Sequence, residues 1–211
     1  MLTVHHLGIS QSDRAVWLCE ELGIPYELKL YERDPVTRLA PPSYKAVSPS
    51  GTAPVITDGE TVLGESAAIL EYLIEIHGGG RLALHPGDKG YADYLFWFHF
   101  ANGSFMPAAM ADMLVHSGLE DTGLLHMLRT RLDRAYDMTE ARLGTQPYLA
   151  GDAFTAADIM TAFPLTTMRV FAPRDLAPYP NIRAYLQRIA TRPAYRKAMA
   201  KADPGFEPPL S

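Results

Sequence analysis

The sequence predicts an α/β domain with a mixed sheet followed by an all-α domain, and three observations support this prediction. Strand-like and helix-like segments alternate through residues 1–77, whereas only helical patterns occur from residue 89 onwards. Between these two parts, residues 78–88 begin with consecutive glycines and contain a proline, which is typical of a linker. We therefore predict two domains, 1–77 and 89–211, joined by the linker 78–88.

The first domain begins with a predicted strand over residues 2–7 and a helix that starts near Arg14. Leu18 and Leu22 share the apolar face of this helix, and Gly23 is suited to end it. This strand–helix unit is the first half of the predicted α/β domain.

The rest of the first domain is predicted as strand, loop, hairpin and helix. Residues 26–32 alternate between polar and apolar and predict a strand near a sheet edge. The polar, proline-bearing residues 33–50 predict a loop. Asp58-Gly59 between two short apolar runs predicts a β-hairpin, and residues 65–77 return to helical spacing.

The second domain contains helical patterns throughout. They cover residues 91–115, 121–143, 155–170 and 181–191, with a short helix after Pro193. Thr155 and Asp158 have the spacing of an N-terminal capping box, flanked by Phe154 and Ile159 as a hydrophobic staple. We interpret this motif as a folding element whose loss costs about 1 kcal/mol.

The composition excludes several classes of function. A net charge of −5 over 211 residues argues against nucleic acid as a partner. A single cysteine excludes a disulfide framework and predicts a cytoplasmic location. No apolar run of about 18 residues and no secretory signal pattern occurs, so no membrane partner is expected. The histidines lack metal-ligand spacing, so no metal is expected either.

Three short motifs could carry chemistry, and the first is Ala53-Pro54 before a strand-like run. A trans bond is the ordinary interpretation, because only about 5–6% of X–Pro bonds are cis. With a cis bond, the backbone of Ala53 would form a free strand edge that can pair with a peptide-like ligand.

The second motif is Glu65-Ser66 at a predicted helix start. Backbone donors and the Ser66 hydroxyl suit a carboxylate there, and Glu65 can accept from an ammonium group. A free amino-acid end would satisfy both residues. The alternative is that Ser66 is only a helix cap.

The third motif is the pair Ser10 and Ser12 before the first helix. Both hydroxyls can be interpreted as helix caps. Alternatively, one of them donates a hydrogen bond to a bound thiolate, which the helix N-terminus would also favour.

Aromatic residues cluster in the first helical pattern of the second domain, over residues 94–105. Aromatic side chains around so much of one helix need a second apolar surrounding besides the bundle core. A subunit interface or an apolar ligand pocket would provide it.

Taken together and in order, several phrases resemble the cytosolic glutathione S-transferases. These phrases are "GISQSDR", "EELGIPYEL", "SPSGTAPVI", "GESAAILEYL" and "FTAADI", and they span essentially the whole chain. The phrase "LFWFHFANGSFMP" most resembles the serine-type bacterial and fungal members. The resemblance implies a thioredoxin-like N-terminal domain, an all-helical C-terminal domain and a homodimer.

The resemblance also implies a glutathione site. Ser66 would hold the γ-glutamyl carboxylate and Glu65 the ammonium group of glutathione. Ala53, before a cis Pro54, would pair with the cysteinyl backbone. The activating hydroxyl would be Ser10, with Ser12 as the alternative.

Some positions differ from the family pattern. Thr52, which we include in the predicted glutathione-binding set, replaces the usual Lys or Gln, and Ala40 replaces a basic residue. Arg38 or Lys45 could bind the glycine carboxylate instead. Asn102 replaces the glutamate of the fourth helix.

We therefore expect a glutathione transferase that needs glutathione as co-substrate and joins it to a small apolar electrophile. Asn102, Phe105, Met106 and Met110 are the predicted electrophile pocket. A peroxidase or isomerase that uses glutathione on the same fold is one alternative. A non-catalytic binding protein that has kept the fold is another, favoured by Thr52 and Ala40.

Overall fold

The computed structural model describes residues 1–48 and 50–211. The chain divides into two compact units, and each is described by itself. Unit 1 comprises Met1–Arg81 and Thr191–Glu207, and unit 2 comprises Leu82–Ala190 and Pro208–Ser211. Residues 191–207, which the prediction assigns to the helical domain, thus cluster with the first unit.

Unit 1 is built on a four-stranded mixed sheet in the order β2-β1-β3-β4. The strands are β1 (Leu2–Leu7), β2 (Glu27–Tyr31), β3 (Val55–Asp58) and β4 (Thr61–Gly64). β1 is parallel to β2 and antiparallel to β3, which forms a hairpin with β4. The predicted hairpin and the edge position of the second strand are therefore confirmed.

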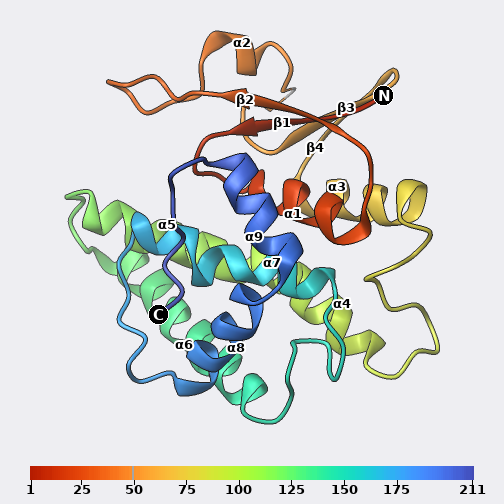
Figure 1. Cartoon of the computed structure of the whole chain (residues 1–211). Coiled ribbons are helices and arrows are strands. Elements are labelled where there is room, and N and C mark those ends of the chain that lie inside the picture. The colour runs from red at the N-terminus through yellow and green to blue at the C-terminus, as the bar shows by residue number, and fades with distance from the viewer. Residues whose placement is uncertain (49) are drawn as a thin grey trace. The chain divides into compact units, whose positions relative to one another are not determined.

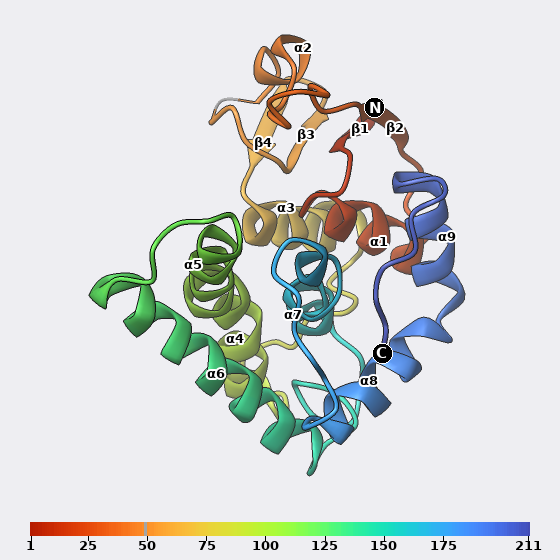
Figure 2. The same ribbon diagram turned by 90° about the vertical axis from the view of Figure 1, so that its left-hand side faces the viewer.

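Helices cover both faces of this sheet (Figures 1 and 2). α1 (Asp13–Leu22) and α3 (Ser66–Tyr72) lie on one face, and α3 continues into the π-helical segment η1 (Leu73–His77). The short helix α2 (Pro42–Lys45) lies on the other face, in a segment predicted as a loop. Proline can start a helix, and the fully buried Tyr44 holds α2 on the sheet.

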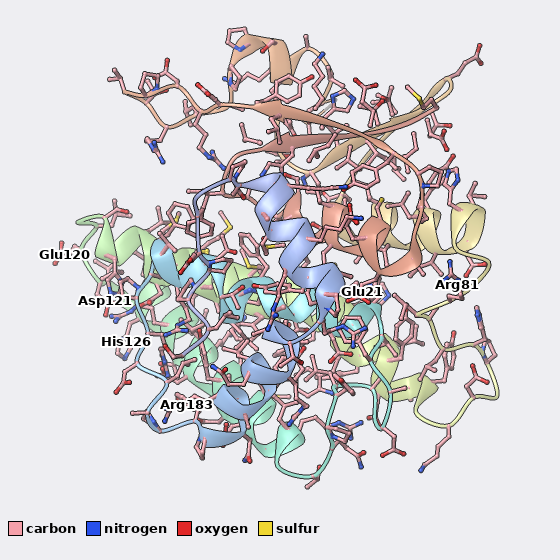
Figure 3. The ribbon with its side chains drawn as sticks, viewed as in Figure 1. Glu21, Arg81, Glu120, Asp121, His126 and Arg183 are labelled. Carbon is pink, nitrogen blue, oxygen red and sulfur yellow. The ribbon has the colours of Figure 1, made fainter. Side chains whose placement is uncertain are left out.

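The last helix of the chain, α9 (Pro193–Ala202), lies beside α1 within unit 1. Glu21, labelled in Figure 3, accepts hydrogen bonds of 2.6 and 2.7 Å from Arg192. Trp17 of α1 meets Tyr195 of α9 edge to face, with ring centroids 4.8 Å apart. Polar and aromatic contacts therefore join the two ends of the chain in one core.

Unit 2 is helical, and its helices differ from the prediction mainly in their interruptions. The helices are α4 (Tyr91–Phe100), α5 (Met106–His116), α6 (Gly123–Leu143), α7 (Ala156–Leu165) and α8 (Pro180–Ala190). The pattern at 91–115 is two helices joined by the π-helical segment η2 (Ala101–Phe105), because the chain must accommodate Pro107 at the start of α5. The pattern at 155–170 ends early and continues as the 3-10 helix η3 (Thr167–Val170).

The predicted capping box begins α7. The Asp158 carboxylate accepts the backbone N–H of Thr155 at 2.8 Å and its hydroxyl at 3.3 Å. It also accepts the N–H of Leu149 and the hydroxyl of Tyr185. The predicted folding element is therefore confirmed, and it ties a loop and α8 to α7 as well.

Candidate functional site

The turn between β1 and α1 holds the two serine hydroxyls that the sequence singles out. Ser10 Oγ donates to the carbonyl oxygen of Leu7 at 2.5 Å and lies 2.7 Å from Ser12 Oγ. Ser12 Oγ accepts the N–H of Leu7 at 3.2 Å and lies 2.9 Å from Nδ1 of His6. The two hydroxyls therefore form one connected network and not two independent caps.

This turn has an unusual backbone conformation that a distant residue holds in place. Ile9 has φ +49°, which is uncommon for a β-branched residue. Its N–H donates to Asp203 Oδ1 at 2.8 Å. Arg33 donates from Nε to the carbonyl oxygen of Gly8 at 2.9 Å. Asp203 and Arg33 thus fix the direction in which Ser10 leaves the sheet.

Of the two serines, Ser10 is the one closer to solvent. Its residue is 6% exposed, whereas Ser12 is fully buried. A ligand that approaches this turn can therefore reach Ser10 first, while Ser12 lies behind it.

The start of α3 combines an exposed carboxylate with an unusual backbone conformation. Glu65 is exposed and has φ +70°, a conformation that L-residues rarely adopt. Ile69 is the first residue whose N–H bonds within the helix, to the Glu65 carbonyl at 2.9 Å. The preceding N–H groups point out of the helix start, where they favour an anion.

A buried guanidinium group donates a hydrogen bond to the first residue of this helix. Arg14 of α1 is 1% exposed and donates from Nη1 to Ser66 Oγ at 3.1 Å and to Gln11 Oε1 at 2.5 Å. Burial lowers the pKa of Arg14 to about 10, against a smaller opposite effect of Asp13. Arg14 therefore keeps its charge at neutral pH, next to the hydroxyl predicted to bind a carboxylate.

The segment before β3 contains a cis peptide bond between Ala53 and Pro54. The bond is cis as the resemblance implies, and the ordinary trans interpretation is wrong. The hydroxyl of Ser48 donates to the carbonyl oxygen of Thr52 at 2.7 Å. The hydroxyl oxygens of Ser50 and Thr52 are hydrogen-bonded to each other, also at 2.7 Å. Ala53 lies just outside β3, which begins at Val55.

The two residues suggested as substitutes for the missing basic residue are both exposed. Arg38 has φ +61°, and its carbonyl oxygen accepts a hydrogen bond from Arg33 Nη1 at 3.0 Å. Lys45 is the last residue of α2. Their side chains are accessible to an anion.

The predicted electrophile residues lie in unit 2 and have different surroundings. Phe105 is fully buried between Phe100 and Tyr136, and Met106 is 5% exposed. Asn102 is half-buried and Met110 is exposed. Phe105 and Met106 are therefore part of the packed core of unit 2.

A cavity of about 330 Å³ lies beside these residues, within unit 2. None of the four predicted residues lines it. Its lining is Phe100, Gly103, Ser104, Pro107, Leu128, Arg131, Arg134, Ala135 and Met138. The neighbours of Phe105 in the chain, Ser104 and Pro107, line the cavity, whereas Phe105 itself does not.

Sequence reasoning missed two residues of the turn network, His6 and Asp203. His6 is 1% exposed, and its Nε2 lies 3.1 Å from Asp203 Oδ2. A histidine near the end of the strand that leads into a Ser-x-Ser turn was a usable signal for the first. No local signal points to Asp203, which lies 194 residues beyond Ile9.

Within residues 1–48 and 50–211, no group of three or more metal-ligating side chains comes together. No helix in that part of the chain is long and apolar enough to cross a membrane.

Comparison with known proteins gives matches along almost the whole chain. Residues 10–76 match the family model "Glutathione S-transferase, N-terminal domain", and residues 106–193 match "Glutathione S-transferase, C-terminal domain". A glutathione S-transferase of Schizosaccharomyces pombe is 34% identical, over 96% of this chain and 88% of its own length. One of Zea mays is 33% identical, over 81% of this chain and 80% of its own.

A solved structure agrees with these matches. The glutathione S-transferase structure from Actinobacillus pleuropneumoniae superposes with a TM-score of 0.86 at 34% identity, over 96% of this chain and 93% of its own. With the mixed sheet and the helices described above, these matches confirm the predicted fold class, a thioredoxin-like domain followed by a helical domain.

Proposed function

The chain belongs to the glutathione S-transferase family, and we propose that it is a serine-type member that activates the thiol of glutathione with Ser10. The observation that carries this proposal is the content of unit 1. A hydroxyl at a strained turn, a helix start backed by a buried guanidinium and a cis proline segment all occur in this one unit. The hydroxyl suits the thiol of glutathione, the helix start suits its γ-glutamyl end, and the cis-proline segment suits its cysteinyl backbone.

The γ-glutamyl end of glutathione would bind at the start of α3. The N–H groups there and the Ser66 hydroxyl donate to its carboxylate, and Arg14 behind Ser66 adds a favourable charge. The exposed Glu65 carboxylate accepts from its ammonium group. The backbone of Ala53 pairs with the cysteinyl residue as an added strand does. Arg38 or Lys45 receives the glycine carboxylate.

The chemical step needs only a thiolate and a positioned electrophile. A free thiol with pKa near 8.5 is only slightly ionised at neutral pH. Lowering this pKa by about 2 units makes most of it thiolate and requires about 2.7 kcal/mol. A charge-assisted hydrogen bond from Ser10 at a helix start supplies energy of this order.

In the transfer itself, the thiol proton leaves to solvent before attack. A sulfur lone pair then forms the bond to the electrophilic carbon, and the leaving group departs with the electrons of the bond that breaks. The enzyme contributes thiolate stabilisation and proximity. Of the four residues predicted for the electrophile side, Asn102 and Met110 remain our proposal, because Phe105 and Met106 are packed in the core of unit 2. Detoxification of apolar electrophiles would be the role.

We also propose a homodimer in the cytoplasm. Leu95 and Phe96 of α4 are 38% and 45% exposed, which supports an apolar surface that a second copy could cover. Sedimentation at micromolar concentration tests this, because a single species of about 23 kDa would contradict the dimer.

The experiment that tests the main proposal is a titration of bound glutathione. Thiolate absorbance of the purified protein with glutathione, followed against pH, should give a thiol pKa about 2 units below that of free glutathione. Turnover of a chlorodinitrobenzene should rise with the same pKa. Binding with an unshifted pKa would contradict Ser10 activation and favour a non-catalytic binding protein.

A second arm of this experiment separates the enzymatic alternatives. With a shifted thiol pKa, the protein is tested on an aryl halide and on an organic hydroperoxide. Turnover of the hydroperoxide alone would replace the transferase by a peroxidase on the same fold.

A further inference from the structure

The serine turn is connected to a buried histidine and a carboxylate by an unbroken series of short contacts. Ser10 Oγ lies 2.7 Å from Ser12 Oγ, and Ser12 Oγ lies 2.9 Å from His6 Nδ1. His6 Nε2 lies 3.1 Å from Asp203 Oδ2. We call these four side chains the serine–histidine chain.

The hydrogens in this chain can be assigned by counting donors and acceptors. A carbonyl oxygen only accepts, so the single hydroxyl hydrogen of Ser10 is directed to Leu7 O, 2.5 Å away. The contact of 2.7 Å between the two serines then requires Ser12 to donate to Ser10. Ser12 has no second hydrogen, so its contact of 2.9 Å with His6 requires a hydrogen on Nδ1.

The remaining contacts agree with this assignment. Ser12 Oγ accepts from Leu7 N–H and from His6, which fills its two lone pairs. Ser10 Oγ accepts from the hydroxyl and the N–H of Ser12, the latter at 3.3 Å. The opposite assignment would leave Ser10 and Leu7 as two oxygens 2.5 Å apart with no hydrogen between them.

We propose that His6 is a positioning residue: its Nδ1–H makes the Ser12 hydroxyl donate to Ser10, so that the Ser10 hydroxyl keeps its own hydrogen for donation to a bound thiolate. The proposal rests on the proposed function, because it assumes that Ser10 contacts the glutathione sulfur. When the thiolate arrives, the Ser10 hydrogen turns from the Leu7 carbonyl to the sulfur. The rest of the chain keeps its direction.

The two carboxylate oxygens of Asp203 make different contacts in this arrangement. Its Oδ1 holds the N–H of Ile9, and its Oδ2 faces the other nitrogen of His6. The second contact has the distance of an ion pair but not the direction of a hydrogen bond. Arg33 is the cation on the other side of the turn, where it donates to the carbonyl oxygen of Gly8.

The neighbouring histidine provides a matched control. His5 is also buried on β1, but its ring contacts Tyr31 at 2.9 Å and Thr57 at 3.1 Å. Successive residues of a strand point to opposite faces of the sheet, so the His5 ring has no contact with the two serines. His5 is therefore a buried histidine of the same strand that lies outside the serine–histidine chain.

The experiment compares His6→Leu, His6→Asn and His5→Asn in the whole protein, by the thiol pKa of bound glutathione and its Kd. We expect His6→Leu to raise the bound thiol pKa by about 1 unit, which lowers both the thiolate fraction and conjugation at pH 7 about 3-fold, and to weaken Kd by no more than about 3-fold. The amide N–H of His6→Asn can take the place of Nδ1–H and should restore most of the shift. His5→Asn should leave the shift unchanged.

The outcomes separate this proposal from the proposed function. An unshifted thiol pKa in the wild-type protein would contradict Ser10 activation itself. A shifted wild-type pKa that persists in His6→Leu would overturn only the role of His6. If His6→Leu fails to fold, nitrogen NMR of the imidazole ring in the wild-type protein tests the proposal instead. An Nδ1 of His6 without a hydrogen would contradict the assignment.

Discussion

At the scale of single residues, Ser10 and Ser12 differ in what their loss should remove. Ser10→Ala removes the hydroxyl nearest to solvent, and we expect glutathione to bind with nearly unchanged Kd. Conjugation at neutral pH should fall about 10- to 100-fold, because a bound thiol without its donor is mostly protonated. Steady-state kinetics against pH check this.

Ser12→Ala is the informative comparison for that prediction. It leaves the buried N–H of Leu7 without its acceptor, which costs about 1–3 kcal/mol of stability. Full activity of Ser10→Ala together with a slow, stable Ser12→Ala would reassign the activating hydroxyl to Ser12.

Glu65 is the residue where backbone strain and ligand binding meet. Its φ of +70° costs an L-residue about 1 kcal/mol or more, and glycine adopts this conformation freely. We therefore expect Glu65→Gly to raise the free energy of unfolding by about 1 kcal/mol and to weaken glutathione binding about 10-fold or more. Urea unfolding and calorimetry measure the two effects.

Glu65→Ala is the control, since it removes the carboxylate and keeps the strained backbone. It should bind as weakly as Glu65→Gly without the gain in stability. Equal unfolding free energies for both variants would show that the strain at this position is negligible.

At the scale of secondary-structure elements, Glu20 joins α1 to α9. Its carboxylate accepts from Lys197 at 2.7 Å, Lys201 at 2.5 Å and Tyr26 at 2.7 Å. Burial alone would raise the pKa of Glu20, but these hydrogen bonds outweigh it and hold the pKa at about 2. Because the folded pKa is below the unfolded one, this stabilisation is present above about pH 4.5 and is lost as the pH falls towards 2.

We expect Glu20→Gln to lower the free energy of unfolding by about 1–2 kcal/mol at pH 7 and by progressively less below pH 4.5. Urea unfolding at several pH values checks this. The exposed Glu60→Gln is the matched control and should change little. A Glu20→Gln deficit that is independent of pH would mean that packing, and not charge, joins the two helices.

The capping box of α7 contains a carboxyl group whose pKa is shifted in the opposite direction, upward. Asp158 is fully buried, and burial raises its pKa to about 6 in spite of the hydrogen bonds that it accepts. Since the folded pKa is the higher one, the contribution of Asp158 to stability is full below about pH 4 and decreases as the pH rises through about 6.

Asp158→Asn should therefore destabilise the protein by about 1–3 kcal/mol, because an amide N–H₂ faces donors that the carboxylate satisfied. The deficit relative to wild type should be larger at pH 4 than at pH 7. Thermal unfolding of this variant beside the exposed Asp152→Asn measures it. A deficit that grows with pH would contradict the raised pKa.

At the scale of the whole molecule, the features predicted from the sequence are those with local causes. The strands, the hairpin and the capping box follow from residues a few positions apart, and all of them occur. The short helix α2 was missed because its stability comes from burying Tyr44 on the sheet and not from a periodic pattern.

The local structure around the candidate site was predictable where a motif carries its own geometry, as at the helix that begins at Ser66. It was not predictable where distant segments meet. Asp203 reaches Ile9 and His6 from beyond α9, and the assignment of Phe105 to the core of unit 2 depends on Phe100 and Tyr136. Periodicity indicates that a residue is buried, but it cannot distinguish a core position from a pocket wall.

The discontinuity of unit 1 has a consequence for the order of events during synthesis. Ile9 and His6 leave the ribosome long before Asp203, yet the carboxylate that holds them belongs to Asp203. The α/β unit can form its sheet early, but its serine turn must wait until Asp203 has been translated. A nascent chain stalled before α9 should therefore contain a recognisable sheet and an incomplete serine turn.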